Sequence, residues 1–346
     1  MSYFSIIIPV YNRAGLMDAC VASVSSQTFT DFEVILIDDG STDATPAMLL
    51  GYTEADRRFR IITHPENRSV LVARYTGMKH AAGKYVLFLD SDDELAPDAL
   101  SVLYESLEQS PVDILRFGHE EVYHNTEGTR KTIPEQNRVI MPPVTDCPLF
   151  EMLSDRMAPN VWKNCYAISV VKKALRRTVP FYCNMGEDVY WSTVLFSCAK
   201  SDATCPACLY HYHIGGGMST AKSNHTVKQL LGYMNHIESC MDHVKKYLSR
   251  YAPEFLSLTE DKFLRMNCFL MLTFVIDETD ETAAEEYVKV FDTDVLRPLY
   301  LHGMNTVLPF KRYRQNTPGE KTGGLAASDL PNVHYLEDLM CFEKKN

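Results

Sequence analysis

The sequence lacks any apolar run long enough to cross a bilayer. Its longest apolar segment, CFLMLTFVI at residues 268–276, has about half the length that a membrane-spanning helix requires. Long basic runs are also missing, because lysine and arginine occur in pairs at most, and the formal net charge is −11. A chain with this charge repels polyanions, so we expect no nucleic-acid partner. Because the apolar run is short, we expect a protein that is soluble or at most peripheral on a membrane.

Signals for nucleotide binding and for secretion are missing as well. No GxGxxG follows the first apolar segment and GxxxxGK[ST] occurs nowhere, so neither a dinucleotide fold nor a phosphate-binding loop with its lysine is supported. The sequence does not start with a charged segment followed by an apolar leader, which leads us to expect a cytoplasmic protein, with peripheral association at the inner face of the membrane as an alternative. We expect its ten cysteines to be reduced thiols without a structural disulfide.

What is present is the rhythm of an α/β protein. Hydrophobic residues make up 46% and charged residues 23% of the 346 residues, as in a globular protein with a sizeable core. Up to residue 118, short apolar segments alternate with segments of helical spacing, which predicts a mostly parallel sheet flanked by helices. The expected strands are 4–11, 33–38, 59–64, 84–90 and 112–118, and the expected helices are 16–27, 46–56, 69–82 and 98–109.

The pattern changes along the rest of the chain. Residues 119–160 are polar and contain proline, which predicts a hairpin or an excursion from the sheet. We then expect helices at 170–177 and 187–200 and a strand at 208–214. These segments complete a predicted nucleotide-binding catalytic domain over residues 1–222. Residues 223–346 predict a mainly helical extension, with helices at 224–250, 258–277 and 280–300, which either packs on that domain or makes an oligomer or membrane contact.

Polar residues follow three of the expected strands. They are Pro9, Tyr11 and Asn12 after the first strand, Asp38, Asp39 and Ser41 after the second, and Asp90, Asp92 and Asp93 after the fourth. Ligands of open parallel sheets bind beyond the carboxyl ends of the strands, so we expect these residues to form one site. The carboxylates of Asp90 and Asp92 suit Mg²⁺ or Mn²⁺ bound together with a diphosphate. For Asp93 and Glu94, capping of the next helix is an equally good interpretation.

Cysteine and histidine gather in the segment CPACLYHYHI. Cys205, Cys208, His211 and His213 provide enough ligands for a zinc ion. On a strand, however, His211 and His213 share a face that Cys208 does not, so a tetrahedral site made from this segment alone is strained. We therefore do not favour a zinc site in this segment.

Four segments occur in a characteristic order along the chain: SIIIPVYN, SVSSQTFTDFEVILIDDGSTD, AAGKYVLFLDSDDEL and MGEDVYW. Together they resemble the family 2 glycosyltransferases of the A-type fold, and they span about residues 4–215. The resemblance implies an A-type nucleotide-binding sheet and an inverting transfer of a sugar from a nucleotide donor. No QxxRW-like segment is present, so we expect a non-processive enzyme.

For the base of the donor, the resemblance implies a pocket lined by Pro9, Tyr11 and Asn12. Asp39 would hydrogen-bond the base. The ring of Tyr11 offers a face for stacking, which agrees with this role.

For the diphosphate, the resemblance implies that Asp90 lies against the ribose and the metal and that Asp92 ligates the cation. Arg74 matches an arginine that the family commonly places near these acids. His213 stands where relatives often have an arginine, and we expect it to contact a phosphate or to be a third metal ligand. Arg13 is another departure from the family pattern, and we expect it to lie away from the catalytic residues.

Sugar transfer also requires removal of a proton from the acceptor hydroxyl. Glu187 and Asp188 begin an expected helix, whose dipole favours ionised acids, and the family motif makes Asp188 the general base and Glu187 its support. Helix capping beside Gly186 is the structural alternative. Trp162 and Lys163 resemble the acceptor-side segment of the family, although core packing is an alternative for Trp162.

The expected function is therefore a metal-dependent transfer of one sugar, from a UDP-sugar, to a hydroxyl of a saccharide or a lipid-linked acceptor. A nucleotidyltransferase would need a glycine-rich, basic loop after the first strand, and VYNRAGL is poor in glycine and in basic residues. A catalytically silent protein that binds nucleotide sugars, or an assembly protein, is the remaining alternative. The intact Glu187–Asp188 pair argues against it.

Overall fold

The computed structural model describes residues 2–124, 130–134, 147–214, 226–277 and 281–302. The chain divides into two compact units. The first consists of residues 1–221 and 239–259, and the second of residues 222–238 and 260–346. The predicted division into domains after residue 222 stays a prediction.

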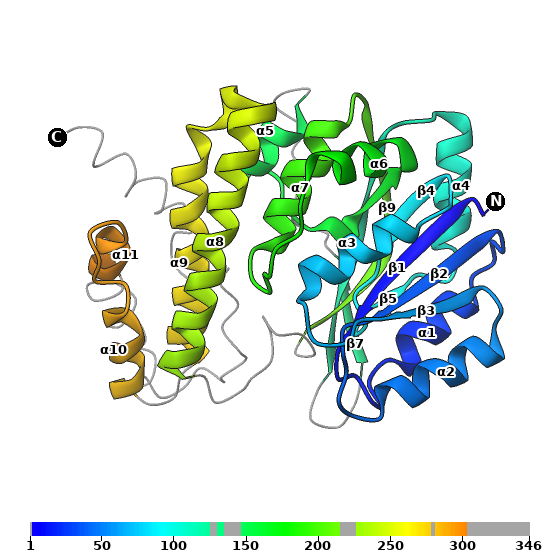
Figure 1. Ribbon diagram of the computed structural model, residues 1–346, viewed down its shortest axis with the longest axis horizontal. Coiled ribbons are helices and arrows are strands. Elements are labelled where there is room, and N and C mark those ends of the chain that lie inside the picture. Colours follow the sequence, from blue (N-terminus) through cyan, green and yellow to red (C-terminus); the bar gives the residue numbers. More distant parts are fainter. Residues whose placement is uncertain (1, 125–129, 135–146, 215–225, 278–280, 303–346) are drawn as a thin grey trace. The chain divides into compact units, whose positions relative to one another are not determined.

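The first unit is built on one mixed sheet (Figure 1). Its strand order is β3-β2-β1-β4-β8-β6-β9-β5, with β7 paired to β6. The strands are β1 Phe4–Val10, β2 Phe32–Asp38, β3 Phe59–Thr63, β4 Tyr85–Phe88, β5 Glu94–Leu95, β6 Ile114–His124, β7 Arg130–Pro134, β8 Asn164–Ala167 and β9 Asp202–Ile214. The strands β1 to β4 are parallel, whereas β8 runs antiparallel between β4 and β6. The predicted fold class is confirmed, with a sheet that is mixed beyond β4.

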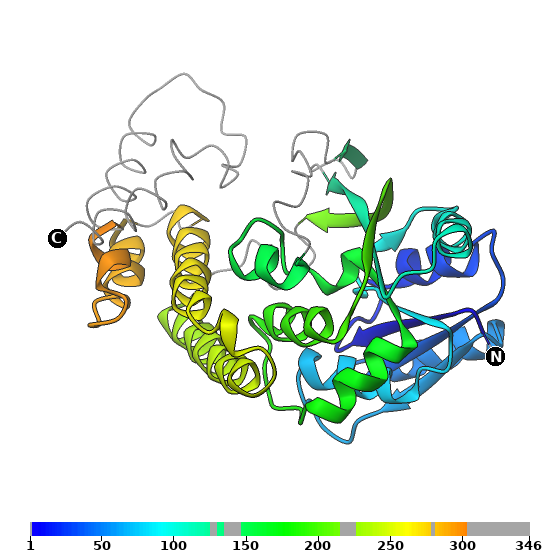
Figure 2. The same ribbon diagram turned by 90° about the horizontal axis from the view of Figure 1, so that it is seen from above.

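Helices cover both faces of the parallel part. They are α1 Asp18–Ser25, α2 Thr45–Ala55 and α3 Val70–His80. Because connections between parallel strands are right-handed, α1 and α2 lie on one face, and α3, which returns across the sheet to β4, lies on the other. Figure 2 shows β1 between α1 and α3. The strand residues between these layers, such as Ile6, Ile7 and Ile8, are fully buried, so the strand ends at one edge remain to form a site.

The second half of the first unit contains both expected and unexpected elements. Its helices are α4 Ala99–Gln109, α5 Pro148–Leu153, the 3-10 turn η1 Val161–Lys163, α6 Ile168–Arg177, α7 Glu187–Cys198 and the 3-10 turn η2 Pro253–Phe255. The predicted hairpin is confirmed, because β6 and β7 pair antiparallel. The strand β8 and the helix α5 were missed, since four and six residues are too few to show a period.

The second unit is helical in the part of it that the structure describes. The helices of this region are α8 Val227–Tyr251, whose end belongs to the first unit, α9 Leu258–Asp277, α10 Glu281–Lys289 and α11 Arg297–His302. The helix expected at 280–300 is thus two helices. No helix among the described residues has the length and apolar character needed to cross a membrane.

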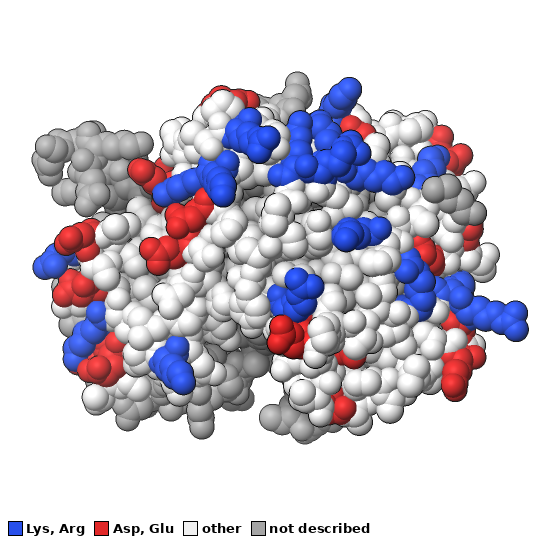
Figure 3. All heavy atoms as spheres, viewed as in Figure 1, with Lys and Arg blue, Asp and Glu red and all other residues white. Residues whose placement is uncertain are grey.

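Basic side chains gather on one surface of the first unit. The exposed members are Lys172 and Arg176 on α6 and Lys246 and Arg250 near the end of α8. The two helices meet where the guanidinium of Arg177 lies 4.6 Å from the ring centre of Tyr251. Figure 3 shows basic side chains along the upper part of the view, where Figure 1 has α6 and the end of α8. We call this region the α6–α8 basic surface.

Candidate active site

The loops that follow β1 and β2 are tied to each other by hydrogen bonds. The backbone N–H of Asn12 donates to Ser41 Oγ at 3.0 Å, and the N–H of Thr42 donates to Asn12 Oδ1 at 2.8 Å. Asn12 has a φ of 49°, a left-handed conformation that asparagine tolerates better than most residues. Pro9 is buried in β1, and Tyr11 is 44% exposed. The predicted base-pocket residues therefore lie together.

Asp39 continues this group from the end of β2. Its side chain is buried, and its Oδ1 accepts hydrogen bonds from the backbone N–H of Arg68 at 3.0 Å and from His64 Nδ1 at 2.6 Å. We call Tyr11, Asn12, Asp39, Ser41 and His64 the base half of the site, after the nucleobase that the resemblance predicts there.

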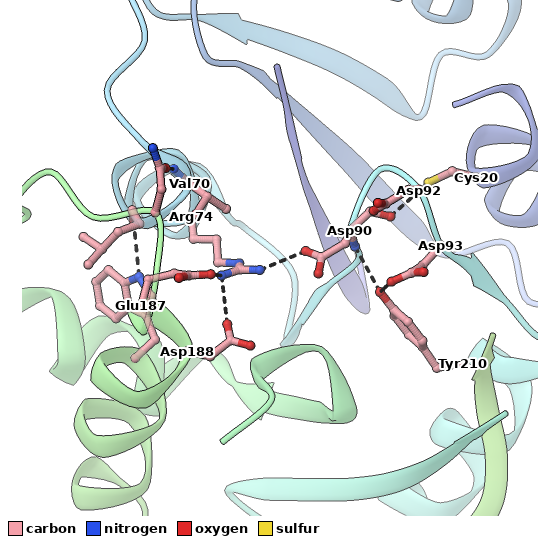
Figure 4. A network of polar contacts seen from close by, with 12 residues as sticks. Cys20, Val70, Arg74, Asp90, Asp92, Asp93, Glu187, Asp188 and Tyr210 are labelled. Atoms are coloured by element: carbon pink, nitrogen blue, oxygen red, sulfur yellow. Dashed lines mark hydrogen bonds and ion pairs between the residues drawn. The ribbon is translucent and has the colours of Figure 1, made fainter. Parts of the chain in front are cut away.

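Arg74 joins the acids of two distant segments. From α3, its Nη2 donates to Asp90 Oδ1 at 2.9 Å, and its Nη1 donates to Glu187 Oε1 at 3.0 Å and to Asp188 Oδ1 at 2.9 Å. Figure 4 shows the guanidinium between Asp90 on one side and Glu187 and Asp188 on the other. Burial alone would lower the pKa of Arg74, but the charges of Asp188, Asp90 and Glu187 outweigh burial and raise it. Arg74 thus remains a cation and brings the two acid segments to one place.

The acids at the start of α7 do not cap this helix. Gly186 precedes α7 with a φ of 88°, a conformation that favours glycine, and no side chain caps the helix at this position. Glu187 and Asp188 follow it and turn to Arg74 instead. Behind the turn, the thiol of Cys240 on α8 donates to the carbonyl of Gly186 at 3.0 Å. The capping alternative is therefore not supported, and the pair faces Asp90.

The acids after β4 are held by β9. Asp93 is buried and accepts hydrogen bonds from the Tyr210 hydroxyl at 2.7 Å and from the N–H of His213 at 2.8 Å. The Tyr210 hydroxyl in turn accepts the N–H of Asp90 at 3.2 Å, so one tyrosine orders the whole turn (Figure 4). Asp93 is therefore an anchor between β4 and β9, not a helix cap.

Arg13 lies next to the acids, contrary to our expectation. Its Nη2 is 3.5 Å from Asp92 Oδ2, and both side chains are partly exposed. The loop after β1 reaches across the carboxyl edge of the neighbouring β4, which the sequence pattern alone does not reveal. We call Asp90, Asp92, Asp93, Glu187 and Asp188, with Arg13 and Arg74, the acid half of the site.

Burial and neighbouring charges raise the pKa values of three of these acids. Burial and the charge of Asp90 raise the pKa of Asp92. Burial and the charges of Asp90 and Asp92 raise the pKa of Asp93 to about 8. Burial also raises the pKa of Asp188 to about 8, although Arg74 opposes it. A positive charge added to this half would favour the ionised forms.

The three predicted metal ligands are not assembled into one site. Among the described residues, no three His, Cys, Asp or Glu side chains are grouped so that they could hold a metal ion. His213 Nε2 lies 2.8 Å from Glu94 Oε1, so its ring is engaged with another acid. Asp90 and Asp92 by themselves provide hard oxygens in a crowded acid cluster, which fits a divalent cation whose other ligands are water and phosphate.

The cysteines and histidines of β9 do not converge either. His211 Nε2 lies 3.8 Å from Glu120 Oε2, while His213 faces Glu94, and the Cys205 side chain is buried. This arrangement gives no support to a zinc site in the described part of the chain.

Trp162 belongs to an aromatic stack in the interior. Its ring is stacked with those of Tyr210 and Tyr212, at centroid distances of 4.4 and 5.3 Å, and only 4% of the residue is exposed. The ammonium of Lys163 lies 5.6 Å from the Trp162 ring centre. This geometry favours core packing for Trp162, and a contact with an acceptor stays a prediction.

Three residues of the site were missed at the level of the sequence: His64, Tyr210 and Arg13. For His64 a signal exists, because it directly follows β3 and thus lies at the same sheet edge as the ends of β1, β2 and β4. For Tyr210 and Arg13 the sequence offers no comparable signal, since their contacts depend on the path of β9 and of the β1 loop.

Comparison with solved structures establishes the class of fold. The chain is similar to a crystal structure of S. aureus TarS in complex with UDP-GlcNAc. The TM-score is 0.60 at 17% sequence identity, and the match covers 91% of this chain and 92% of the other. At this identity the likeness concerns the fold alone, and it confirms the A-type glycosyltransferase fold.

Sequence comparison identifies the family. Residues 5–160 match the model of the family described as glycosyl transferase family 2. The chain is 33% identical over 173 residues to the uncharacterized glycosyltransferase EpsJ of Bacillus subtilis (strain 168), or 49% of each chain. It is 27% identical over 261 residues, 74% of each chain, to the uncharacterized glycosyltransferase YibD of Escherichia coli (strain K12). Residues 5–160 therefore form a glycosyltransferase family 2 domain, and the chain spans about half the length of EpsJ.

Proposed function

We propose that the protein transfers a single sugar from a nucleotide-sugar donor to a hydroxyl of an acceptor, with inversion at the anomeric carbon. The observation that carries the proposal is the bridge made by Arg74, which contacts Asp90 and Asp188 with separate nitrogen atoms, each at 2.9 Å. The acid next to the donor's proposed place and the proposed base are therefore one arginine side chain apart. A glycosyl transfer by single displacement needs this proximity, because the acceptor must attack the carbon that the leaving diphosphate departs from.

Asp188 is the proposed general base. It would take the proton of the acceptor hydroxyl as the new bond forms at the anomeric carbon and the bond to the diphosphate breaks. Its position in the first turn of α7 and its hydrogen bond to Arg74 hold the carboxylate in place. Glu187 accepts a hydrogen bond from the same nitrogen of Arg74 and would help to keep the guanidinium in contact with Asp188.

Asp90 and Asp92 are the proposed ligands of a divalent cation, Mn²⁺ or Mg²⁺, which when bound supplies positive charge to the leaving diphosphate. Both carboxylates are partly exposed at the edge of β4, so they can be reached from solvent. Arg13 would contribute a second positive charge beside Asp92. For His213 to become a third ligand or a phosphate contact, its ring would have to leave Glu94.

UDP is the proposed nucleotide. The choice is supported by the carboxylate of Asp39, which can accept the N–H of a uracil ring, and by a UDP-GlcNAc complex of a protein with the same fold. Tyr11 would stack on the base. The sugar itself, and whether the acceptor is a free or a lipid-linked saccharide, depend on the loops at the acceptor side, where Trp162 and Lys163 keep their predicted role.

For a lipid-linked acceptor, we also propose peripheral association with the inner face of an anionic membrane through the α6–α8 basic surface. The charge of this surface is opposite to that of the chain as a whole, and lysine and arginine near an anionic bilayer each add about 1 kcal/mol. Cosedimentation with vesicles that contain an anionic lipid should be lost when Lys172, Arg176, Lys246 and Arg250 are changed to glutamate. Equal sedimentation of the variant would end this part of the proposal. Homo-oligomer contacts through the C-terminal helices stay a prediction.

The central experiment is a donor-hydrolysis assay. The protein is incubated with Mn²⁺ and a panel of UDP- and GDP-sugars, and release of the nucleoside diphosphate is measured with and without EDTA. Slow release from a UDP-sugar, abolished by EDTA, is the expected result. Binding of nucleotides without turnover of any donor, with or without candidate acceptors, would instead favour a silent nucleotide-sugar-binding protein.

A further inference from the structure

His64 occupies a closed position between the base half of the site and helix α3. Its side chain is 6% exposed, and both ring nitrogens are engaged: Nδ1 with Asp39 Oδ1 at 2.6 Å and Nε2 with Thr76 Oγ1 at 2.9 Å. Because a carboxylate oxygen can only accept, Nδ1 carries the proton of the shorter bond. Thr76 lies two residues after Arg74 on α3, so His64 connects Asp39 to the helix that carries the arginine of the acid half.

The backbone around this pair is equally constrained. The N–H of His64 donates to the carbonyl of Asp38 at 2.8 Å, which extends the β2–β3 ladder to the edge of the site. The loop after His64 passes so close to Gly40 that an added Cβ would lie 2.4 Å from the carbonyl carbon of Glu66. Gly40 also has a φ of 73°. Neither Asp39 nor His64 can therefore shift without moving two strand ends.

One oxygen of Asp39 is left for a ligand. Oδ1 receives both the His64 ring and the Arg68 N–H, whereas within the described residues no hydrogen bond is directed at Oδ2. A carboxylate oxygen held in this way can accept the ring N–H of uracil. It is mismatched to cytosine, whose corresponding ring nitrogen is an acceptor.

We propose that His64 is a positioning residue for base recognition: with Thr76, it fixes the carboxylate of Asp39 so that the free oxygen selects a base with a ring N–H. This inference rests on the proposed function, because it needs a nucleotide in the base half. His64 itself does not touch the donor. It affects the affinity for the nucleotide and the discrimination between bases, and neither effect requires a bound cation.

The experiment measures binding of UDP and of CDP by calorimetry, without divalent cations, to the full-length protein and four variants. His64→Leu should weaken UDP binding about tenfold, because Asp39 loses a buried hydrogen bond, while CDP binding changes little, so that the preference for UDP falls. His64→Asn keeps an N–H near the place of Nδ1 and should restore most of the preference. Thr76→Val should weaken UDP binding about threefold.

His80→Leu is the matched control, since His80 is an exposed histidine on the same helix, bonded through Nδ1 to the carbonyl of Thr76. It should bind both nucleotides like the wild type. Parallel losses for UDP and CDP in His64→Leu, or unchanged binding in both His64→Leu and Thr76→Val, would refute the inference and leave the proposed function standing. A wild-type protein that binds no nucleoside diphosphate, with or without Mn²⁺, would overturn the proposed function and this inference together.

Discussion

The base half and the acid half of the site are held together in different ways. In the base half, hydrogen bonds tie Asn12 to Ser41 and hold one oxygen of Asp39 on His64 and the Arg68 N–H, so that its other oxygen is already in place for a ligand. In the acid half, five carboxylates face two arginines, and the pKa values of Asp92, Asp93 and Asp188 are raised. The first half is preorganised, whereas the second has an excess of negative charge that a ligand must compensate.

The difference separates binding from chemistry. Preorganised hydrogen bonds give affinity and selectivity without further change. Crowded acids give a base whose proton affinity depends on the charges that surround it. Changes in the acid half should therefore affect turnover and the response to pH and metal, whereas changes in the base half should affect chiefly the affinity for nucleotides and the discrimination between them.

The largest effect is expected for Asp188→Asn. The amide cannot take up the proton of the acceptor hydroxyl, so kcat should fall at least about 100-fold, while the dissociation constant for UDP stays within about twofold of the wild-type value. Turnover by radiolabelled sugar transfer and UDP binding by calorimetry test the two parts. An Asp188→Asn enzyme with full activity would remove Asp188 from the role of base.

Asp92→Ala is expected to uncouple nucleotide binding from the metal. In the wild type, Mn²⁺ should tighten UDP binding; in the variant this gain should shrink about tenfold or more, because one of two proposed ligands is missing. Binding in EDTA should be unchanged, since the base half is intact. Titrations of UDP with and without Mn²⁺ measure the difference, and an equal metal effect in both proteins would contradict the proposed ligand.

Arg74→Met is expected to lower the free energy of unfolding by about 3 kcal/mol at pH 8, because Asp90, Glu187 and Asp188 lose their common counter-charge. Without the arginine the pKa of Asp188, which the Arg74 charge lowers, should rise further, and a buried acid with a raised pKa makes the fold less stable as the pH increases. The loss should therefore be smaller at pH 5, where the carboxyls are more protonated. Urea unfolding at both pH values tests this, with Arg176→Met on the exposed face of α6 as the control. A loss that is equal at both pH values would argue against a charge effect.

Turnover should increase with pH. A general base acts in its ionised form, and the pKa of Asp188 in the ligand-free protein is raised to about 8, so kcat/KM should increase roughly tenfold from pH 7 to pH 9. The profile is measured with a UDP-sugar at a Mn²⁺ concentration well below saturation, because a bound cation would lower the pKa of Asp188 and move the increase to lower pH. A profile that is flat from pH 5 to pH 9 would mean that the group that titrates is not Asp188.

The smallest effect is expected at Tyr11. Replacing it with alanine should weaken UDP binding about threefold to tenfold through the loss of stacking, whereas Tyr11→Phe should bind like the wild type. Because Tyr11 is 44% exposed, neither change should alter thermal stability noticeably. If Tyr11→Phe binds as weakly as Tyr11→Ala, the hydroxyl and not the ring makes the contact.

The sequence predicted the part of the fold that has a clear period. The strands β1 to β4 and the helices between them fall within a few residues of their expected limits, and the carboxyl-edge rule brought Asp39 and Asp90 to one side of the sheet. Beyond β4 the helices α4, α6 and α7 also lie near their expected places, but the short strand β8 was missed and β6 continues to His124, past its expected end at residue 118. The resemblance to glycosyltransferase family 2 rested on motifs, and the match of residues 5–160 to the family model confirms it for this segment.

The site was harder to predict, because contacts between distant segments depend on side-chain reach. The same edge rule that selected Asp39 also applies to His64, which directly follows β3, although we predicted no role for it. Arg13 had been placed away from the acids, but its long side chain spans the gap from β1 to Asp92. Burial of Trp162 follows from the path of β9, which no local pattern encodes.

The helix α8 has a practical consequence for dissecting this protein into fragments. Its second half belongs to the first unit, where the Cys240 thiol contacts the turn before Glu187 and the Tyr247 hydroxyl lies 2.6 Å from Ser197 Oγ at the far end of α7. A truncation at residue 222 would expose the back of the helix that carries Asp188 to water. A minimal fragment intended for crystallisation or ligand screening should therefore continue to residue 259, where the first unit ends.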